Sequence, residues 1–335
     1  MEVFKLFRIL KFIKKNMVFF IPITMILAII YGYWFNPKPL KILITPIIFL
    51  MVYPMMVNLK YKELLKNDNT KLHITTQFIN FLIIPFIGFA IGKLFFPDNF
   101  YLITGLLIVT LLPTSGMTIS WTGFAKGNVS AAIKMMLIGL IIGSIVTPLY
   151  LKGLVGASID IPFMGIIAQI VKIVFIPMIA GYFTQKFIIN KYGQETYIKK
   201  YKPKFPLLST LGLIGIVFIS TSLKAKTIVN NPSLLVKILI ALVVLYSVNF
   251  IITTLIARKL FNRENSIALV YATVMRNLSI CLAIAMSLFA TKGSDIALVI
   301  AVAFIVQIQG AAWYLKFVNK IFGEKINIKN AEFVN

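Results

Sequence analysis

Polar side chains gather inside a long apolar run at residues 112–128, where the sequence reads LPTSGMTISWTGFAKGN. Pro113 and Gly116 stand there among five hydroxyl residues, which are Thr114, Ser115, Thr118, Ser120 and Thr122. A proline removes one backbone donor, and in hydrocarbon such freed groups are tolerated only where protein or a water-lined cavity satisfies them. The stretch therefore predicts a broken helix that binds a solute. The alternative is a plain proline kink whose hydroxyls bond back to the backbone.

A second stretch with the same character covers residues 271–281, which read YATVMRNLSIC. It carries Arg276, Asn277 and Ser279 inside another apolar run. We interpret the two stretches as a pair. An arginine at such a break is a forked donor that suits an anionic solute group. Alternatively, backbone carbonyls and water hold Arg276 in a purely structural role.

The composition indicates a membrane protein. The chain has 335 residues, of which 59% are hydrophobic, and its mean hydropathy is +0.91. We attribute the net charge of +24 to cytoplasmic loops that face anionic lipid, and expect no nucleic-acid partner. A single cysteine and a single histidine exclude an intramolecular disulfide and a histidine-ligated metal site. Without an acidic cluster or a histidine constellation, we expect no enzymatic activity.

About 20 apolar residues cross a bilayer as a helix. On that basis the sequence predicts ten spans, at residues 17–34, 40–58, 75–95, 101–122, 130–151, 160–184, 206–223, 232–257, 266–290 and 295–318. With the N-terminus inside, the cytoplasmic pieces hold 23 Lys and Arg and the outer loops hold 7. Positive charge marks the cytoplasmic side. We therefore expect a multi-pass protein of the cell membrane with both termini in the cytoplasm.

Charged residues are rare within these spans. All ten acidic residues fall outside the spans or at their edges. Lys172 and Arg276 lie near mid-span, where a charge costs about 2.5–3.5 kcal/mol on insertion scales. Each should therefore face protein, water or an anion, and for Lys172 structural and solute-binding roles both stay open. Because no Asp, Glu or His lies deep in the membrane, a coupling sodium ion would have to bind neutral oxygens. Proton coupling through Lys172 is the alternative.

The predicted fold is all-α, with ten transmembrane helices arranged as two inverted five-helix repeats and with broken crossing helices 4 and 9. Opposite topology follows when each half holds an odd number of spans. Residues 1–16 form a cytoplasmic amphipathic N-terminus and residues 17–184 hold the first repeat. A basic cytoplasmic linker covers 185–205, the remaining helices cover 206–318, and the cytoplasmic tail covers 319–335. Segment 160–184 is assigned to the second repeat.

Three motifs resemble the superfamily that joins bile acid:sodium symporters to arsenite-efflux permeases. They are LPTSGMTISWTGFAKGN, MVYPMMVNLKYKEL from Met51 and VMRNLSICLAIA from Val274. The first two are closer to the arsenical-resistance branch. Thr114 stands where arsenite permeases carry a cysteine. Ala272 and Arg276 stand where the symporters carry a sodium-binding glutamate and glutamine, and their Ser-Asn pair falls at Thr118 and Ile119.

The resemblance implies a secondary transporter that moves a small solute, expected to be an anion, by alternating access. Arsenite efflux is the alternative. The expected partners are the solute and membrane lipids, with a monomeric or homodimeric state. No cofactor is expected. Sodium coupling stays open, although the family's sodium ligands are poorly preserved in this sequence. The predicted solute-binding residues are Arg276, Asn277, Ser279, Thr114, Ser115, Thr118, Asn80 and Lys172.

Overall fold

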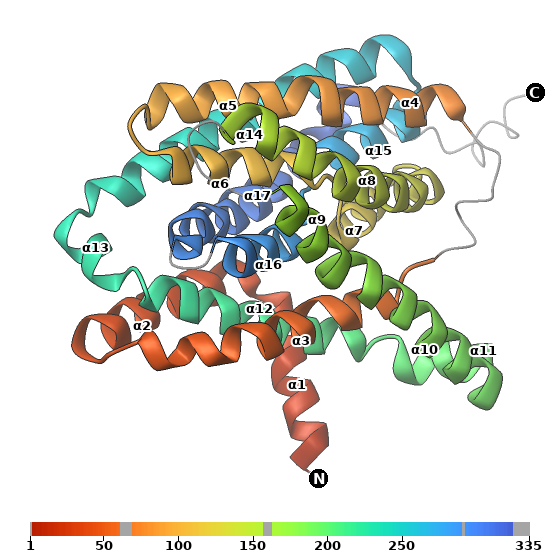
Figure 1. Ribbon diagram of the computed structural model, residues 1–335. Helices are drawn as coiled ribbons and strands as arrows, with labels where there is room; N and C mark the ends of the chain where they lie inside the picture. Colours follow the sequence, from red (N-terminus) through yellow and green to blue (C-terminus); the bar gives the residue numbers. More distant parts are fainter. Residues whose placement is uncertain (1, 61–68, 157–162, 290–291, 324–335) are drawn as a thin grey trace, which may run out of the picture.

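The computed structural model describes residues 2–60, 69–156, 163–289 and 292–323. Within these ranges the chain is helical, and its β-type pairing is limited to one isolated backbone bridge (Figure 1). The predicted all-α fold is confirmed for the described residues. Residues 324–335 of the expected cytoplasmic tail lie outside them.

Seven helical runs in the described ranges are long and apolar enough to cross a membrane, or eight if the bent pair formed by α1 and α2 is one span. The seven are Lys38–Val57, Thr70–Phe95, Val129–Val155, Ile167–Tyr192, Gln194–Ser222, Ser233–Leu260 and Gly293–Phe322. The predicted spans 101–122 and 266–290 are each divided into two shorter helices, which fall below this length.

The elements follow one another along the chain as α-helices with short 3₁₀ (η1) and π (η3 to η6) turns. They are α1 (Glu2–Lys15), α2 (Met17–Trp34), η1 (Lys38–Leu43), α3 (Ile44–Val57), α4 (Thr70–Phe78), η3 (Ile79–Ile83), α5 (Ile84–Phe95), α6 (Phe100–Leu111), α7 (Gly116–Phe124), α8 (Val129–Tyr150), η4 (Leu151–Val155), α9 (Phe163–Ile170), η5 (Val171–Phe175), α10 (Ile176–Tyr192), α11 (Gln194–Thr196), η6 (Tyr197–Tyr201), α12 (Phe205–Ser222), α13 (Ala225–Asn230), α14 (Ser233–Leu260), α15 (Arg263–Val274), α16 (Leu278–Leu288) and α17 (Gly293–Phe322).

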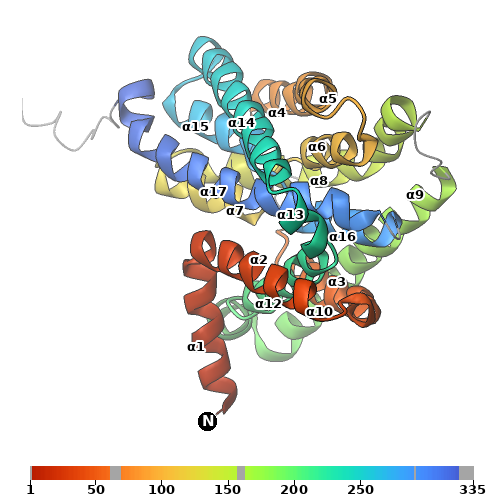
Figure 2. The ribbon, with the colours of Figure 1, turned by 90° about the vertical axis from the view of Figure 1, so that its left-hand side faces the viewer.

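The helices form two layers that lie face to face (Figures 1 and 2). The small layer holds α2, α3, α10 and α12, with α12 packed on α2 and α3 and with α10 packed on α3. Gly212 allows the close approach of α12 to α3, because a Cβ there would lie 2.6 Å from the backbone nitrogen of Met51. The large layer holds α4 to α8 and α14 to α17, in which α6 packs on α5 and α17.

The two breaks cross inside the large layer. Helix α6 ends at Leu111 and α7 begins at Gly116, while α15 ends at Val274 and α16 begins at Leu278. Pro113 and Arg276 form an antiparallel bridge between the breaks. The Thr114 N–H donates to the Met275 carbonyl at 2.6 Å, and the Asn277 N–H donates to the Leu112 carbonyl at 2.8 Å. Each break therefore supplies hydrogen bonds that the other has lost, as unwound backbone at membrane depth requires.

Most of the predicted linker 185–205 is helical in the structure. Helix α10 continues to Tyr192, and α11 and η6 follow it directly. Gly193, with a φ of 82°, makes the only turn between these helices, and a salt bridge between Glu195 and Lys199 lies one helical turn apart on the next segment. The predicted linker is therefore mostly helical. Its cytoplasmic side stays a prediction.

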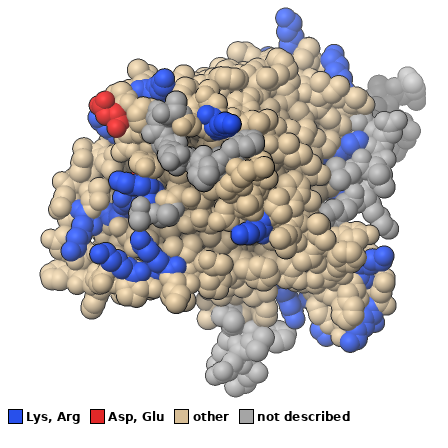
Figure 3. All heavy atoms as spheres, viewed as in Figure 1, with Lys and Arg blue, Asp and Glu red and all other residues tan. Residues whose placement is uncertain are grey.

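The surface is consistent with a lipid environment. In Figure 3 most of the visible face is uncharged, and basic side chains gather mainly toward its two ends. Large apolar side chains face outward on the small layer, among them Ile179, Phe183 and Phe187 of α10, which are 56%, 61% and 62% exposed. Such helices present apolar side chains to acyl chains instead of water.

Candidate functional site

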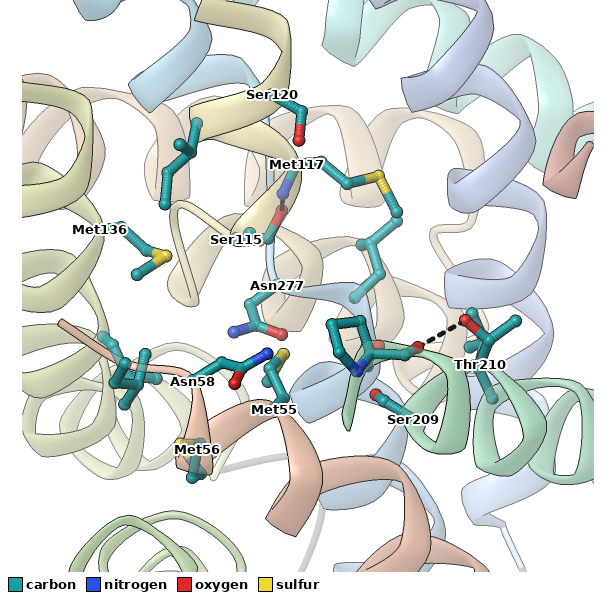
Figure 4. Close-up of a pocket in the computed structure, with 18 of the residues that line it drawn as sticks. Met55, Met56, Asn58, Ser115, Met117, Ser120, Met136, Ser209, Thr210 and Asn277 are labelled. Atoms are coloured by element: carbon teal, nitrogen blue, oxygen red, sulfur yellow. Dashed lines mark hydrogen bonds between the residues drawn. The ribbon is translucent and has the colours of Figure 1, made fainter. Parts of the chain in front are cut away.

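A cavity of about 440 Å³ lies between the small layer and the crossing of the breaks. Its walls come from the C-terminal end of α3, the first turns of α7, α12 and α16, and one face of α8. Figure 4 shows Ser115 and Asn277 of the large layer on one side and Met55, Ser209 and Thr210 of the small layer on the other. Its size is that of sites for small organic ligands.

Two helix N-termini begin at this cavity. Ser115 caps α7, because its hydroxyl accepts from the Met117 N–H while the Thr118 hydroxyl accepts from the Ser115 N–H. Asn277 caps α16 by accepting from the Ile280 N–H. Residues of both first turns line the cavity. Because a helix N-terminus carries partial positive charge, the two half-helices favour a negative group between them.

Arg276 lies at the crossing and borders the cavity. Its side chain is only 2% exposed. The Nη1 atom donates to the Asn80 side-chain oxygen at 3.1 Å and to the Thr110 carbonyl at 3.0 Å. The Nη2 atom is buried without a hydrogen-bond partner in the structure. These protein partners are neutral oxygens, so a full positive charge is held beside the cavity.

Gln307 of α17 fixes the backbone of that arginine. Its side-chain oxygen accepts from the Arg276 N–H at 2.7 Å, and its amide nitrogen donates to the Arg276 carbonyl at 3.3 Å. The Tyr246 hydroxyl donates to the same Gln307 oxygen at 2.9 Å. Sequence reasoning missed this residue. The available signal was a lone amide in the middle of an apolar segment, because polar groups inside spans are expensive and need a purpose.

The structure brings four of the predicted solute-binding residues to the cavity, namely Ser115, Arg276, Asn277 and Ser279. The other four, Thr114, Thr118, Asn80 and Lys172, are not among its lining residues.

Three of those four residues form hydrogen bonds within the fold, and the fourth is exposed. Thr114 is buried in a left-handed conformation, with φ of 64°, and its hydroxyl donates to the Pro113 carbonyl. Thr118 completes the cap of α7, and the Asn80 amide donates to the Ala272 carbonyl while its oxygen accepts from the arginine. Lys172 is exposed on η5, outside the cavity.

Sequence reasoning also missed the apolar and basic parts of the lining. Five methionines border the cavity, which are Met17, Met55, Met56, Met117 and Met136. Three lysines, Lys14, Lys60 and Lys202, border it as well, and among the described residues no Asp or Glu does. Unbranched, polarizable methionines form adaptable binding surfaces. The lining therefore combines an apolar wall with positive charge, although its residues are far apart along the chain.

Comparison with known proteins gives the family. Residues 45–231, more than half of the chain, match the Sodium Bile acid symporter family. The chain belongs to this family. The predicted resemblance is confirmed, and the chain is a multi-pass membrane transporter of this superfamily.

Relatives come from both branches of the superfamily. The arsenical-resistance protein Acr3 of Corynebacterium glutamicum is 26% identical over 263 residues, which cover 74% of this chain and 70% of the relative. Acr3 of Alkaliphilus metalliredigens is 26% identical over 199 residues, or 56% of each chain. Sodium/bile acid cotransporter 7 of Xenopus tropicalis is 28% identical over 153 residues, which cover 45% of this chain and 43% of the relative. The second and third alignments thus span about half of the relatives' lengths.

Proposed function

We propose that this chain is a secondary transporter that binds a small anionic solute in the cavity and moves it by alternating access. The observation that carries the proposal is the charge of the cavity. Arg276 and the first turns of α7 and α16 meet at one end, and lysines border it elsewhere. No carboxylate from the part of the chain that the structure describes belongs to the lining. An anion there would gain from both helix dipoles and from the fixed guanidinium.

The contacts that we assign to the solute follow from the lining. An anionic group would lie against the first-turn groups around Ser115, Asn277 and Ser279, beside the buried guanidinium of Arg276. The methionine side chains then cover the apolar part of the solute. We expect binding to displace water from this wall, because apolar burial and a few placed polar groups together fix a ligand.

Alternating access would move the small layer against the large layer. In this proposal the ten spans form two inverted five-helix repeats, and the crossing of the breaks marks their centre. The cavity is bordered by Lys14, Lys60 and Lys202, which belong to segments that the positive-inside rule assigns to the cytoplasm. The conformation described here would then be open toward the cytoplasm, with both termini on that side of the cell membrane.

The test is solute uptake by purified protein in proteoliposomes, with a panel of labelled organic and inorganic anions. Arg276→Ala should abolish uptake while the protein still inserts in the membrane. Lys172→Ala is the matched control, because it removes the other mid-span base from an exposed position outside the cavity. That variant should transport normally. Unchanged anion uptake in Arg276→Ala would refute the role of the arginine.

Arsenite efflux is a second candidate function, favoured by the similarity to two arsenical-resistance proteins. The site weighs against a thiol-dependent route. Cys281 is fully buried, donates to the Ile108 carbonyl and does not line the cavity. Expression in arsenite-sensitive cells tests this function. Protection at verified expression would favour efflux, and unchanged sensitivity would favour the anion carrier.

A further inference from the structure

The family's name implies sodium, so the crossing can be tested for its fit to that ion. Sodium at a broken helix is held by unwound carbonyls and side-chain oxygens. Such oxygens are present here. Asn80 lies on the π turn η3, and Thr110 lies in the last turn of α6 just before the break.

Both oxygens are already engaged by a cation. The Thr110 carbonyl and the Asn80 side-chain oxygen accept from the same atom, Nη1 of Arg276. A sodium ion bound to either oxygen would therefore lie within a few ångströms of the guanidinium, and like charges at that distance repel strongly. Ala272 of α15, whose carbonyl accepts from the Asn80 amide, is apolar and fully buried, so it supplies no compensating negative charge. The residues present do not fit sodium at this place.

We propose that the Arg276 guanidinium is a tethered cation that takes the place of a coupling sodium ion at the crossing of the breaks. It supplies positive charge and ties α6, η3 and the break before α16 together, as a bound ion would. Because the charge is covalently attached, neither the stability of the folded protein nor solute binding requires sodium. The statement about solute binding rests on the proposed function, whereas the statement about the ion does not.

The first measurement is thermal unfolding of the purified full chain in NaCl, KCl or choline chloride at equal ionic strength. A ligand that binds only the folded state raises its Tm. Wild-type protein should unfold at the same temperature in all three salts. A sodium-specific rise in the wild-type Tm would overturn the proposal, and this readout needs no solute.

The second measurement uses Arg276→Ala, which leaves the oxygens of Asn80 and Thr110 without their donor. Methylguanidinium or sodium should raise the Tm of this variant by several degrees and leave wild type unchanged, because the vacated place can accept a free cation. Lys172→Ala is the control and should respond to neither. An Arg276→Ala protein that ignores both cations contradicts the proposal. If Arg276→Ala does not fold, the Tm of Arg276→Lys and of wild type in the three salts tests the proposal. Neither protein should show a sodium-specific rise in Tm.

Solute flux separates this inference from the function. Absence of anion uptake together with a sodium-insensitive Tm would refute the proposed solute and leave the tethered cation standing. Anion uptake driven by a sodium gradient would refute the tethered cation and leave the carrier standing.

Discussion

Replacing Gln307 by leucine should destabilise the crossing of the breaks without changing the volume of the core greatly. The Gln307 side chain is fully buried and holds three groups, the Arg276 N–H, the Arg276 carbonyl and the Tyr246 hydroxyl. A leucine side chain can form a hydrogen bond with none of these groups. Each buried group left without a partner costs about 1–3 kcal/mol, so the three together predict a loss of at least about 3 kcal/mol.

Tyr246→Phe is the matched comparison. It removes one donor, but the Gln307 oxygen keeps its bond from the Arg276 N–H. The expected loss is therefore about 1 kcal/mol. The double variant should lose less unfolding free energy than the sum of the two single losses, because it contains no tyrosine hydroxyl that could be left without a hydrogen-bond partner.

The assay is thermal unfolding in detergent, followed by the fraction of protein that stays monodisperse after heating. The order of Tm should be wild type, then Tyr246→Phe, then Gln307→Leu. A Tm of Gln307→Leu equal to that of wild type would refute the stabilising role of the hydrogen bonds between Gln307 and the Arg276 backbone. Equal losses in the two single variants would instead mean that the hydroxyl, and not the arginine backbone, is the important partner.

Three further predictions concern the break and the contact between layers. Gly143→Ala places a Cβ 2.8 Å from the Leu111 carbonyl at the end of α6 and should cost about 1–3 kcal/mol by overpacking, whereas Gly153→Ala, with no atom within 4 Å, should unfold like wild type. Ser115→Ala removes the cap of α7 and should cost about 1 kcal/mol, so an unchanged Tm would speak against that cap. Lys224 and Asp295 form a 2.7 Å salt bridge between the two layers, and both side chains are largely buried. Asp295→Asn should lower the Tm, and exchanging the two residues should restore it, a recovery that an incidental contact would not give.

Local pattern was enough to find the membrane class and the two breaks. Apolar runs of bilayer length and a proline among hydroxyls act through neighbouring residues, so the sequence alone carries them. The polar stretches at 112–128 and 271–281 were predicted as a pair, and the structure crosses them through Pro113 and Arg276. Residues 185–205 were predicted as a basic linker from their charge, and the structure shows that most of this segment is helical.

Only the tertiary structure decided which polar groups face the cavity and which hold the fold. The hydroxyls of Thr114 and Thr118 were predicted to contact the solute. In the structure the Thr114 hydroxyl donates to the Pro113 carbonyl and the Thr118 hydroxyl accepts from the Ser115 N–H. Asn80 lies 196 residues from Arg276 along the chain, and Gln307 lies 31 residues beyond it. No periodicity or spacing encodes such partners, because a buried charge selects them by proximity after the helices pack. The sequence determined that an arginine is buried at a break, and the packing of α4 to α6 and α17 determined what holds it there.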